Sequence, residues 1–411
     1  MPANRIKETL MSAVTSPLPL FDSLEYIDKH PDIHDLDYCY SLAFLKCYRG
    51  SLGTFNSYRR EVERLLQWCR NIAHMSVGQL KREHIETYIK FCQNPPKSWI
   101  GIKKATRFVD KNGERRQNIE WRPFVMTLSK TEHRQGKTID VNNFELSQAT
   151  IKELFAILST YFNYLIQEEY IFMNPVALIR QKSKFIRKQQ SQMQIRRLSS
   201  LQWEYVIATA TTMANNDAKR HERTLFIMTA LYSMYLRISE LAASERWLPK
   251  MCDFYRDHDG NWWFKTVGKG NKERQIAVSN AMLDALIRYR KYLGLSNLPS
   301  VADQTPLLAK TKGKGPISST TYIREMIQDC FDQGINSLAE DGHTEESEAL
   351  NEATVHWLRH TGISDDVKRR PREHVRDDAG HSSSATTDKY IDVELRARHK
   401  TAKNKPILVD G

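Results

Sequence analysis

The 411-residue sequence lacks the features that mark membrane, secreted and disulfide-stabilised proteins. No apolar run approaches the roughly 20 residues that a membrane-spanning helix needs. At the N-terminus, no basic stretch followed by a hydrophobic one marks a secretory signal. The six cysteines include no CxxC pair, which argues against a zinc knuckle and favours reduced core thiols over a disulfide framework. Internal repeats and low-complexity tracts are also absent. The lack of a membrane span, of a secretory signal and of a disulfide framework leads us to expect a cytoplasmic globular protein.

The length and the charge balance give the first positive indications. A chain this long is more typical of two domains than of one. Lys and Arg number 61 against 49 Asp and Glu, a formal net charge of +12. Such an excess favours a polyanionic partner, because each neutralised phosphate releases counterions. General solubility is the competing interpretation, and net charge alone does not separate the two.

The distribution of the basic residues favours nucleic acid. Residues 97–137 carry eleven Lys and Arg against four acids, and residues 180–197 carry basic residues and no acid. Clustered basic runs suit a nucleic-acid track better than a merely soluble surface. The candidate DNA-binding residues of the second run are Arg180, Lys182, Lys184, Arg187, Lys188, Arg196 and Arg197.

Hydrophobic periodicity predicts a helical first domain. Residues 1–36 form an irregular lead-in, and 37–181 form a bundle of about four helices with an insertion at about 96–146. Apolar residues at three- and four-residue steps predict one helix whose start Thr54 caps. Another is predicted over about 83–92, ended by Pro95-Pro96. A further helix begins at Ser147, whose hydroxyl suits an N-cap. Residues 182–197 are the basic interdomain linker.

The second domain, 198–411, changes period along its length. Ser199 or Ser200 caps its first helix, and 224–243 is expected to be one long, mostly buried helix. Short β-rich runs separated by glycine turns, between 251 and 279, predict a three-stranded antiparallel sheet. Helices return from 281, and the acidic segment 334–352 is expected to be a surface loop. The predicted fold is therefore mainly α with a small antiparallel sheet, an α+β class.

Two basic residues in this domain are candidates for chemistry. Arg237 lies where an apolar helix gives way to polar residues, and Glu240, three positions on, suits an orienting partner. By itself this pair is better explained as a structural ion pair. Lys269 lies at the tip of a predicted hairpin, between two glycines that allow close approach to a backbone. Taken alone, it is equally a solvated basic turn.

His356 and Arg359 lie three residues apart, on one face of a predicted helix. His360 lies four residues from His356, so a metal site that also uses Asp365 or Asp366 has to be weighed. The sequence lacks the intervening glutamate of the zinc hydrolase motif, and the nearby arginines would oppose a divalent cation. We therefore expect no metal.

His381 and Tyr390 complete the set. His381 follows Gly380, and alone it would be a capping or surface histidine. Tyr390 is one of 17 tyrosines, and a tyrosine on a late helix is usually half-buried packing. Neither residue is informative singly. The order of the whole set is informative.

That ordered set resembles the tyrosine recombinase, or phage integrase, family. The matching residues are Arg237, Lys269, His356-x-x-Arg359, Gly380-His381 and Tyr390. The hairpin text Val-Gly-Lys-Gly-Asn-Lys-Glu-Arg over Val267–Arg274 is similar to the Xer branch, and the helical region 37–181 to the family's core-binding domain. The chain has Met234-Tyr235-Leu236 where the family usually has Thr-Gly-Leu, and Ala379 where it usually has Leu.

The resemblance implies a role for each residue of the set. Tyr390 attacks the scissile phosphate to give a 3′-phosphotyrosine, and His356 is the base that helps it lose its proton. Lys269 protonates the leaving 5′-oxygen. Arg237 and Arg359 bind the non-bridging oxygens. In addition, His381 donates to the same phosphate, and Glu240 supports the site. No metal, ATP or other cofactor is implied.

The resemblance also implies partners. The substrate is double-stranded DNA, a recombination site with inverted-repeat half-sites around which the two domains close as a clamp. Family members work as a homotetramer on DNA, sometimes with accessory DNA-bending proteins, in integration, excision or resolution, often for a mobile genetic element. The tail 391–411 is the candidate for the exchange between protomers. No membrane partner is expected.

Three other interpretations stay open at this stage. A type IB topoisomerase uses similar chemistry but acts alone, without joining two sites. A catalytically silent DNA-binding protein would bind DNA and form no covalent adduct. A metal-dependent nuclease built on His356, His360 and Asp365 would be abolished by EDTA.

Overall fold

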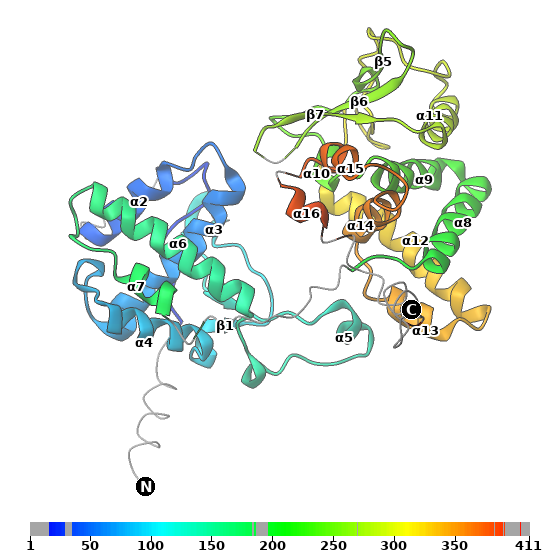
Figure 1. Ribbon diagram of the computed structural model, residues 1–411. Coiled ribbons are helices and arrows are strands. Elements are labelled where there is room, and N and C mark those ends of the chain that lie inside the picture. Colours follow the sequence, from blue (N-terminus) through cyan, green and yellow to red (C-terminus); the bar gives the residue numbers. More distant parts are fainter. Residues whose placement is uncertain are drawn as a thin grey trace, which may run out of the picture. The chain divides into compact units, whose positions relative to one another are not determined.

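The structure, a computed structural model, describes residues 16–28, 35–182, 185, 196–268, 270–381, 383–388, 390 and 403. It forms two compact units, Met1–Ser191 and Gln192–Gly411, each with its own hydrophobic core. Both units are mainly helical, and the small sheets are antiparallel apart from one two-residue pairing (Figure 1). The predicted α+β class is thereby confirmed.

The N-terminal unit is built on helices whose apolar stripes meet in one core. These are α2 (Leu36–Lys46), α3 (Leu52–Trp68), α4 (Arg82–Gln93), α6 (Gln148–Gln167) and α7 (Pro175–Lys182). The Ser147 hydroxyl accepts a hydrogen bond from the Thr150 N–H, which confirms the predicted cap of α6. The prediction for Thr54 was wrong: α3 begins three residues earlier, and Thr54 lies inside its first turn.

The insertion at 96–146 folds onto this core with little regular structure of its own. Strands β2 (Phe108–Lys111) and β3 (Glu114–Gln117) form a hairpin, while β1 (Ile100–Gly101) pairs in parallel with β4 (Phe124–Val125). A short helix, α5 (Lys130–Arg134), follows. Trp99 and Phe124 are almost completely buried among the residues of the helical core. Their burial makes the insertion part of the unit's hydrophobic interior.

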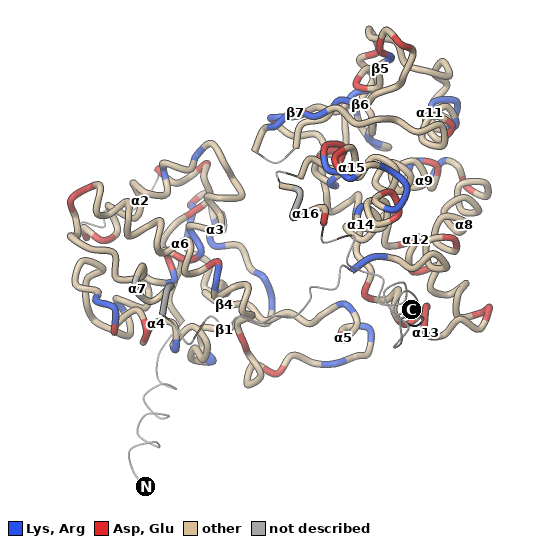
Figure 2. The backbone as a smooth tube through the Cα atoms, in the orientation of Figure 1, with Lys and Arg blue, Asp and Glu red and all other residues tan. Residues whose placement is uncertain are grey.

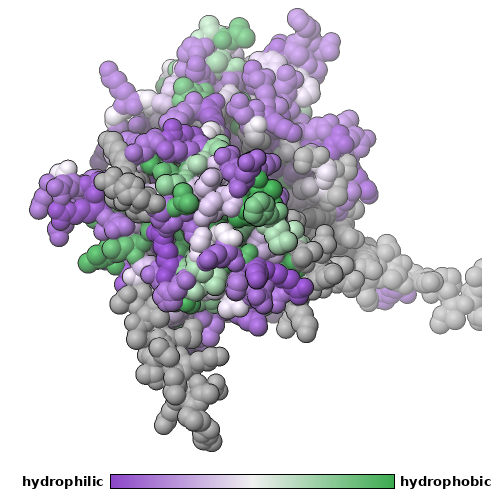
Figure 3. Space-filling model, turned by 90° about the vertical axis from the view of Figure 1, so that its left-hand side faces the viewer, coloured by the Kyte–Doolittle hydropathy of each residue, from purple (hydrophilic) through white to green (hydrophobic). Residues whose placement is uncertain are grey.

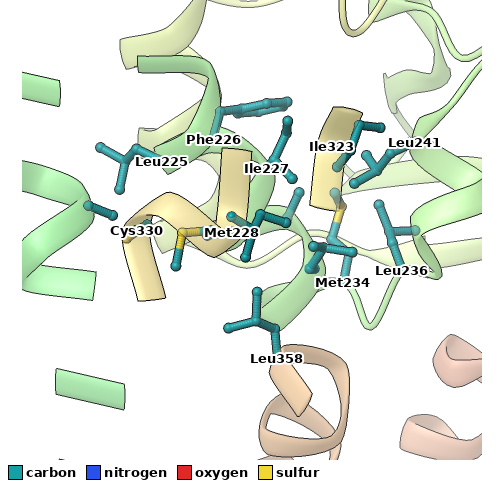
Figure 4. Packing of buried hydrophobic residues seen from close by; sticks show 14 of the residues in the cluster. Leu225, Phe226, Ile227, Met228, Met234, Leu236, Leu241, Ile323, Cys330 and Leu358 are labelled. Carbon is teal, nitrogen blue, oxygen red and sulfur yellow. The ribbon is translucent and has the colours of Figure 1, made fainter. Parts of the chain in front are cut away.

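The C-terminal unit packs nine described helices around a second core (Figures 1 and 4). Figure 4 shows Phe226, Met228, Leu236, Ile323 and Leu358 meeting there from segments far apart in sequence. Ser199 caps the first helix, as predicted, and its partner is the Gln202 N–H. The helices are α8 (Ser200–Asn216), α9 (Ala218–Ser233), α10 (Ile238–Leu241), α11 (Asn280–Tyr292), α12 (Thr320–Glu340), α13 (Thr344–Leu350), α14 (Val355–Asp366), α15 (Arg372–Ala379) and α16 (Ser384–Asp388).

The predicted three-stranded sheet is present in the order β5-β6-β7, all antiparallel. Its strands are β5 (Phe254–Arg256), β6 (Trp262–Val267) and β7 (Glu273–Ala277). The first and last strands are shorter than the sequence suggested, because Met251–Asp253 form a 3-10 turn before β5 and Ser279 caps α11 after β7.

Three further predictions about this chain were wrong. The segment 224–243 is two helices, because the chain turns at Met234–Arg237 and Tyr235 adopts a φ of 49°. The acidic segment 334–352 is mostly helical, since Gly334 and Leu338 of α12 and Leu350 of α13 are buried in the core. The six cysteines form no disulfides, but Cys39 and Cys47 are exposed rather than in a core.

The surface and the helix lengths give no sign of a membrane span. Hydrophilic side chains cover most of the described surface on the side drawn in Figure 3, with separate hydrophobic ones between them. In the part of the chain that the structure describes, no helix combines the length and hydrophobicity that crossing a bilayer requires.

Candidate active site

Arg237 lies at the chain turn between α9 and α10, where it is the N-cap residue of α10. Its backbone N–H donates to Glu240 Oε2 at 2.7 Å, and its Nη1 donates to Glu240 Oε1 at 3.0 Å. Glu240 is 1% exposed, whereas the Arg237 side chain keeps 28% of its surface. The carboxylate therefore fixes a guanidinium that still faces solvent.

Arg274, at the start of β7, is the residue that the sequence analysis missed. Its Nη2 donates to Glu240 Oε2 at 2.6 Å, and its Nη1 donates to the backbone oxygen of Asp378. Glu240 thus joins two arginines that are 37 positions apart in sequence. The only signal in the sequence was that Arg274 is the last residue of the hairpin segment Val267–Arg274, on which part of the family resemblance was based.

Glycines allow this close packing at two places. Gly380 has a φ of 62°, and a Cβ there would lie 2.9 Å from Arg274 Cδ. A Cβ at Gly268 would lie 3.0 Å from Glu240 Oε1, so the hairpin that follows β6 begins directly beside the carboxylate. Lys269 is next in sequence to Gly268 but lies outside the described residues.

Arg359 is held in the interior by α14 and is 2% exposed. Its Nη1 donates to the carbonyl oxygen of Tyr235, and its Nη2 donates to that of Ala379 at 2.6 Å. Burial, together with the positive charges of Arg237 and Arg274, lowers the pKa of Arg359 to about 9. The guanidinium still carries its charge at neutral pH, and the two carbonyl oxygens that accept its hydrogen bonds are neutral.

His381 lies directly after the left-handed Gly380 that ends α15. Its Nε2 is 3.4 Å from Arg359 Nη2, and its Nδ1 is 2.9 Å from the hydroxyl oxygen of Thr387 on α16. Burial lowers the pKa of His381 to about 4, and the neighbouring arginines contribute to the shift. The imidazole is therefore neutral at pH 7.

The phenol of Tyr390 lies beside two histidines, His381 and His360. Its ring stacks on His381 with centroids 5.9 Å apart and lies 5.5 Å from the ring of His360. The rings of His360 and His356 are in turn 4.4 Å apart. Tyr390 is 8% exposed, and burial raises its pKa, an effect that Arg359 and Arg237 oppose. The phenol keeps its proton unless a base accepts it.

His360, beside Tyr390, and His356, beside His360, are neutral at pH 7, so each keeps a nitrogen lone pair, although the lowered pKa makes each a weaker base. Burial lowers the pKa of His356, and Arg359 and Arg237 add to that shift. For His360, burial and the neighbouring His356 lower the pKa to about 4. The buried Nδ1 of His360 has no hydrogen-bond partner among the described residues.

The metal alternative gains nothing from this arrangement. The described residues contain no group of three or more His, Cys, Asp and Glu placed to hold a metal ion. Asp365, the proposed oxygen ligand, accepts a hydrogen bond from the Tyr232 hydroxyl at 2.9 Å and lies 3.7 Å from Arg197 Nη1. The Asp365 carboxylate is thus already bound by a residue of α9 and by a residue of the segment before α8.

The linker residues are only partly described. Arg180 and Lys182 end α7, but their side chains are not described, and Lys184, Arg187 and Lys188 lie outside the described residues. Arg196 is exposed, whereas Arg197 is paired loosely with Asp365. Of the two candidates whose side chains are described, Arg196 is the one that the structure presents directly to solvent.

Comparison with known proteins gives a consistent set of relatives. No protein-family model matches the chain. It is 25% identical over 272 residues to the tyrosine recombinase XerC of Alcanivorax borkumensis, which covers 66% of this chain and 75% of that protein. It is 23% identical over 260 residues to the XerC of Bacillus pumilus, covering 62% and 74% of the two chains. In fold, it is similar to the XerH site-specific recombinase bound to palindromic difH substrate in a post-cleavage complex, with a TM-score of 0.52, 14% identity and 93% of each chain covered.

Proposed function

The chain belongs to the tyrosine recombinase family, and we propose that it cuts and rejoins DNA at specific sites through a covalent bond between Tyr390 and a DNA phosphate. One observation carries the proposal most directly. The Tyr390 ring stacks on His381, and His381 in turn approaches the Arg359 guanidinium at 3.4 Å. A nucleophile, a neutral donor and a cation therefore meet in one place.

The arginines supply the charge that the reaction needs. During attack, negative charge builds on the non-bridging oxygens of the phosphate, and preorganised cations stabilise it. Arg237 and Arg359 fill that role, and His381 donates a further hydrogen bond. Glu240 and Arg274 act on the phosphate only indirectly, because they hold Arg237 and the strand beside it in position.

The proton of Tyr390 has to leave as the phenol oxygen attacks phosphorus. We assign His356 as the base, in accordance with its neutral imidazole. The structure places His360 in ring contact with both His356 and Tyr390. His360 therefore offers a second neutral nitrogen on the path of that proton, a position that the sequence analysis considered only for a metal.

Cleavage and rejoining are the same reaction run in opposite directions. The phenol oxygen forms a bond to phosphorus, the bond to the 5′-oxygen breaks, and Lys269 protonates that oxygen as it leaves. A 5′-hydroxyl then attacks the phosphotyrosine, and the phenol leaves with a proton. Because the intermediate keeps the energy of the phosphodiester bond, neither ATP nor another cofactor is required.

The assembly follows from the same assignment. We propose that the helical region 37–181 is the core-binding domain, that 182–197 is a linker along the DNA backbone, and that 198–411 is the catalytic domain. Double-stranded DNA with inverted-repeat half-sites is the substrate, enclosed by the two domains. A homotetramer forms on it in the cytoplasm, with the tail 391–411 exchanged between protomers.

A suicide substrate tests the proposal. Incubation with a nicked duplex carrying the target site should give a covalent complex that survives denaturation, and Tyr390→Phe should eliminate it. Tyr322→Phe, at a partly exposed tyrosine on α12, is the control and should retain the adduct. An equal yield from the Tyr390 variant would refute the assignment. DNA binding without any adduct would indicate a silent binding protein, and relaxation of supercoils without joining of two sites would indicate a topoisomerase.

A further inference from the structure

The insertion of the N-terminal unit forms one side of a basic groove of about 700 Å³. Its other side is α3, together with the segment around Asp22. Figure 2 shows lysines and arginines distributed along the segment between β1 and α5. Asp22 is the one acidic residue among those that line the groove. The basic residues of the lining are Arg59, Arg60, Lys104, Arg107, Arg115 and Arg122.

Buried ion pairs fix the insertion to the helices, so the groove has a defined shape. Arg107 pairs with Glu63 of α3, which is fully buried, and Arg115 of β3 pairs with Asp22 at 2.7 Å. Behind them, Arg64 donates to the Pro123 carbonyl at 2.9 Å. Breaking a buried pair is strongly unfavourable. These contacts therefore set the insertion at a fixed distance from α3.

Three of the six basic residues have no carboxylate partner among the described residues. Arg59 donates to the backbone oxygen of Asp22 and to Asn56 Oδ1 at 2.8 Å, both of which are neutral. Arg122 donates only to the carbonyl oxygens of Ile119 and Trp121, at 2.6 and 2.8 Å. Lys104 is exposed, with no ion pair in the described structure. The groove therefore carries positive charge that the protein itself does not balance.

The partial burial of the Arg59 guanidinium adds a free-energy cost to this unbalanced positive charge. Its Nε is buried and has no hydrogen-bond partner among the described residues. Burial lowers the pKa of Arg59 to about 10, so the guanidinium stays charged at neutral pH. The Asp22 carboxylate offsets part of this burial cost, but it also pairs with Arg115, and a bound anion would compensate the rest.

The shape and lining of the groove indicate which anion binds. The three unbalanced cations come from α3, the loop before β2 and the loop before β4, so they are spread over several chain segments. Trp121 is 7% exposed, and the Arg107 guanidinium lies 4.7 Å from its ring centroid, so its face is not free to stack on a base. The lining offers cationic groups on separate segments and no free aromatic face, which suits phosphates in series better than stacked bases.

We propose that this groove binds the phosphate backbone of the DNA substrate, with Arg59, Lys104 and Arg122 as its contacts. The inference rests on the proposed function for the identity of the polyanion. It assigns to residues 96–146 a role in affinity rather than sequence selection, since backbone contacts position a protein without specifying a sequence. The site is a property of the insertion, outside the residues on which the family resemblance was based.

The salt dependence of DNA binding tests this proposal. Equilibrium binding of the full chain to duplex DNA is measured over a series of KCl concentrations, in a Tyr390→Phe background so that no covalent step contributes. Each lost phosphate contact should reduce the slope of log K against log[KCl] by about 0.9. The double variant Lys104→Gln/Arg122→Gln should therefore reduce its magnitude by about 2. The double variant Lys104→Arg/Arg122→Gln keeps the positive charge at position 104, so it should lose only about half as much of the slope.

The control has the same change in net charge. Lys90→Gln/Lys291→Gln removes two exposed lysines that do not line the groove and should leave the slope unchanged. An unchanged slope for the groove variant, or an equal loss in the control, would overturn the proposal. Inorganic pyrophosphate gives a further test, by its effect on the thermal unfolding midpoint. If pyrophosphate stabilises the wild-type and control proteins but not the groove variant, while the DNA slope is unaffected, the groove binds a small anion and the proposal is overturned. If wild-type protein forms no adduct but the slopes differ as expected, the proposed function fails and the groove assignment stands.

Discussion

The guanidinium of Arg359 donates a hydrogen bond to the backbone carbonyl oxygen of Tyr235, a residue held at a φ of 49°. That conformation is disfavoured for a bulky side chain, and the family resemblance has glycine at this place. The Tyr235 hydroxyl donates to Asp366 and accepts from Arg370 Nη1 at 3.0 Å. These contacts hold the strained backbone whose carbonyl positions Arg359.

Tyr235→Phe should therefore affect both stability and catalysis. Loss of the buried hydroxyl should lower the free energy of unfolding by about 1–2 kcal/mol, measured by urea denaturation. Adduct formation should slow as well, because the acceptor of Arg359 is less well fixed. Tyr232→Phe is the matched control, since its hydroxyl binds Asp365 at 2.9 Å without supporting a positive φ. Equal slowing in both variants would contradict the positioning role of Tyr235.

Gly362 sets the distance between α14 and α9. A Cβ at this position would lie 2.0 Å from the carbonyl oxygen of Tyr232. Gly362→Ala should force the helices apart and lower the free energy of unfolding by about 3 kcal/mol. Gly53→Ala, at a helical glycine with no atoms within 4 Å of the added Cβ, should be neutral or stabilising. A neutral result at Gly362 would show that the helices do not pack this closely.

Arg274 is expected to be a structural partner of Glu240. Arg274→Met should leave the buried carboxylate without one of its two guanidinium partners and lower the free energy of unfolding by about 3–5 kcal/mol. Combining it with Glu240→Gln removes the unbalanced charge, so the double variant should be more stable than Arg274→Met alone. Additive losses in this double-mutant cycle would show that the two side chains do not interact.

The buried histidines predict that stability falls in mild acid. The pKa values of His360 and His381 are lowered to about 4 in the folded protein, from an ordinary 6.5. Between these values, the unfolded chain binds protons that the folded chain does not, so the free energy of unfolding should fall as the pH decreases from about 6.5 to about 4. Urea midpoints over this range measure the effect. His360→Gln should flatten the profile, whereas exposed His133→Gln should not; a stability that rose toward pH 4 would contradict the prediction.

The role of Lys269 can be separated from mere binding by the leaving group. Lys269→Ala should slow the cleavage of ordinary DNA, because the departing 5′-oxygen is no longer protonated. Cleavage of a substrate with a 5′-bridging sulfur, which needs no such proton, should be nearly unaffected. Single-turnover adduct formation on both substrates gives the answer. Equal slowing on the two would exclude Lys269 as the acid.

Local sequence was sufficient for several helix starts and for the identity of the chemical groups. Ser147 and Ser199 cap helices as expected, because a cap depends on residues two or three positions away. The glycine-separated strands of the C-terminal unit were also predictable from their period and turns. In the same way, the order of arginine, lysine, histidine and tyrosine indicated the family without any knowledge of distances.

Tertiary structure alone decided what those groups touch. The pairing of Glu240 with Arg274, the ring contacts of Tyr390 with His360 and His381, and the break at Tyr235 depend on segments brought together from distant parts of the chain. The acidic segment 334–352 is helical because Leu338 and Leu350 are buried in the core, although its charges suggested a loop. Periodicity and capping act over a few residues and leave their record in the sequence, whereas close approach between distant segments is set by the packing of whole cores.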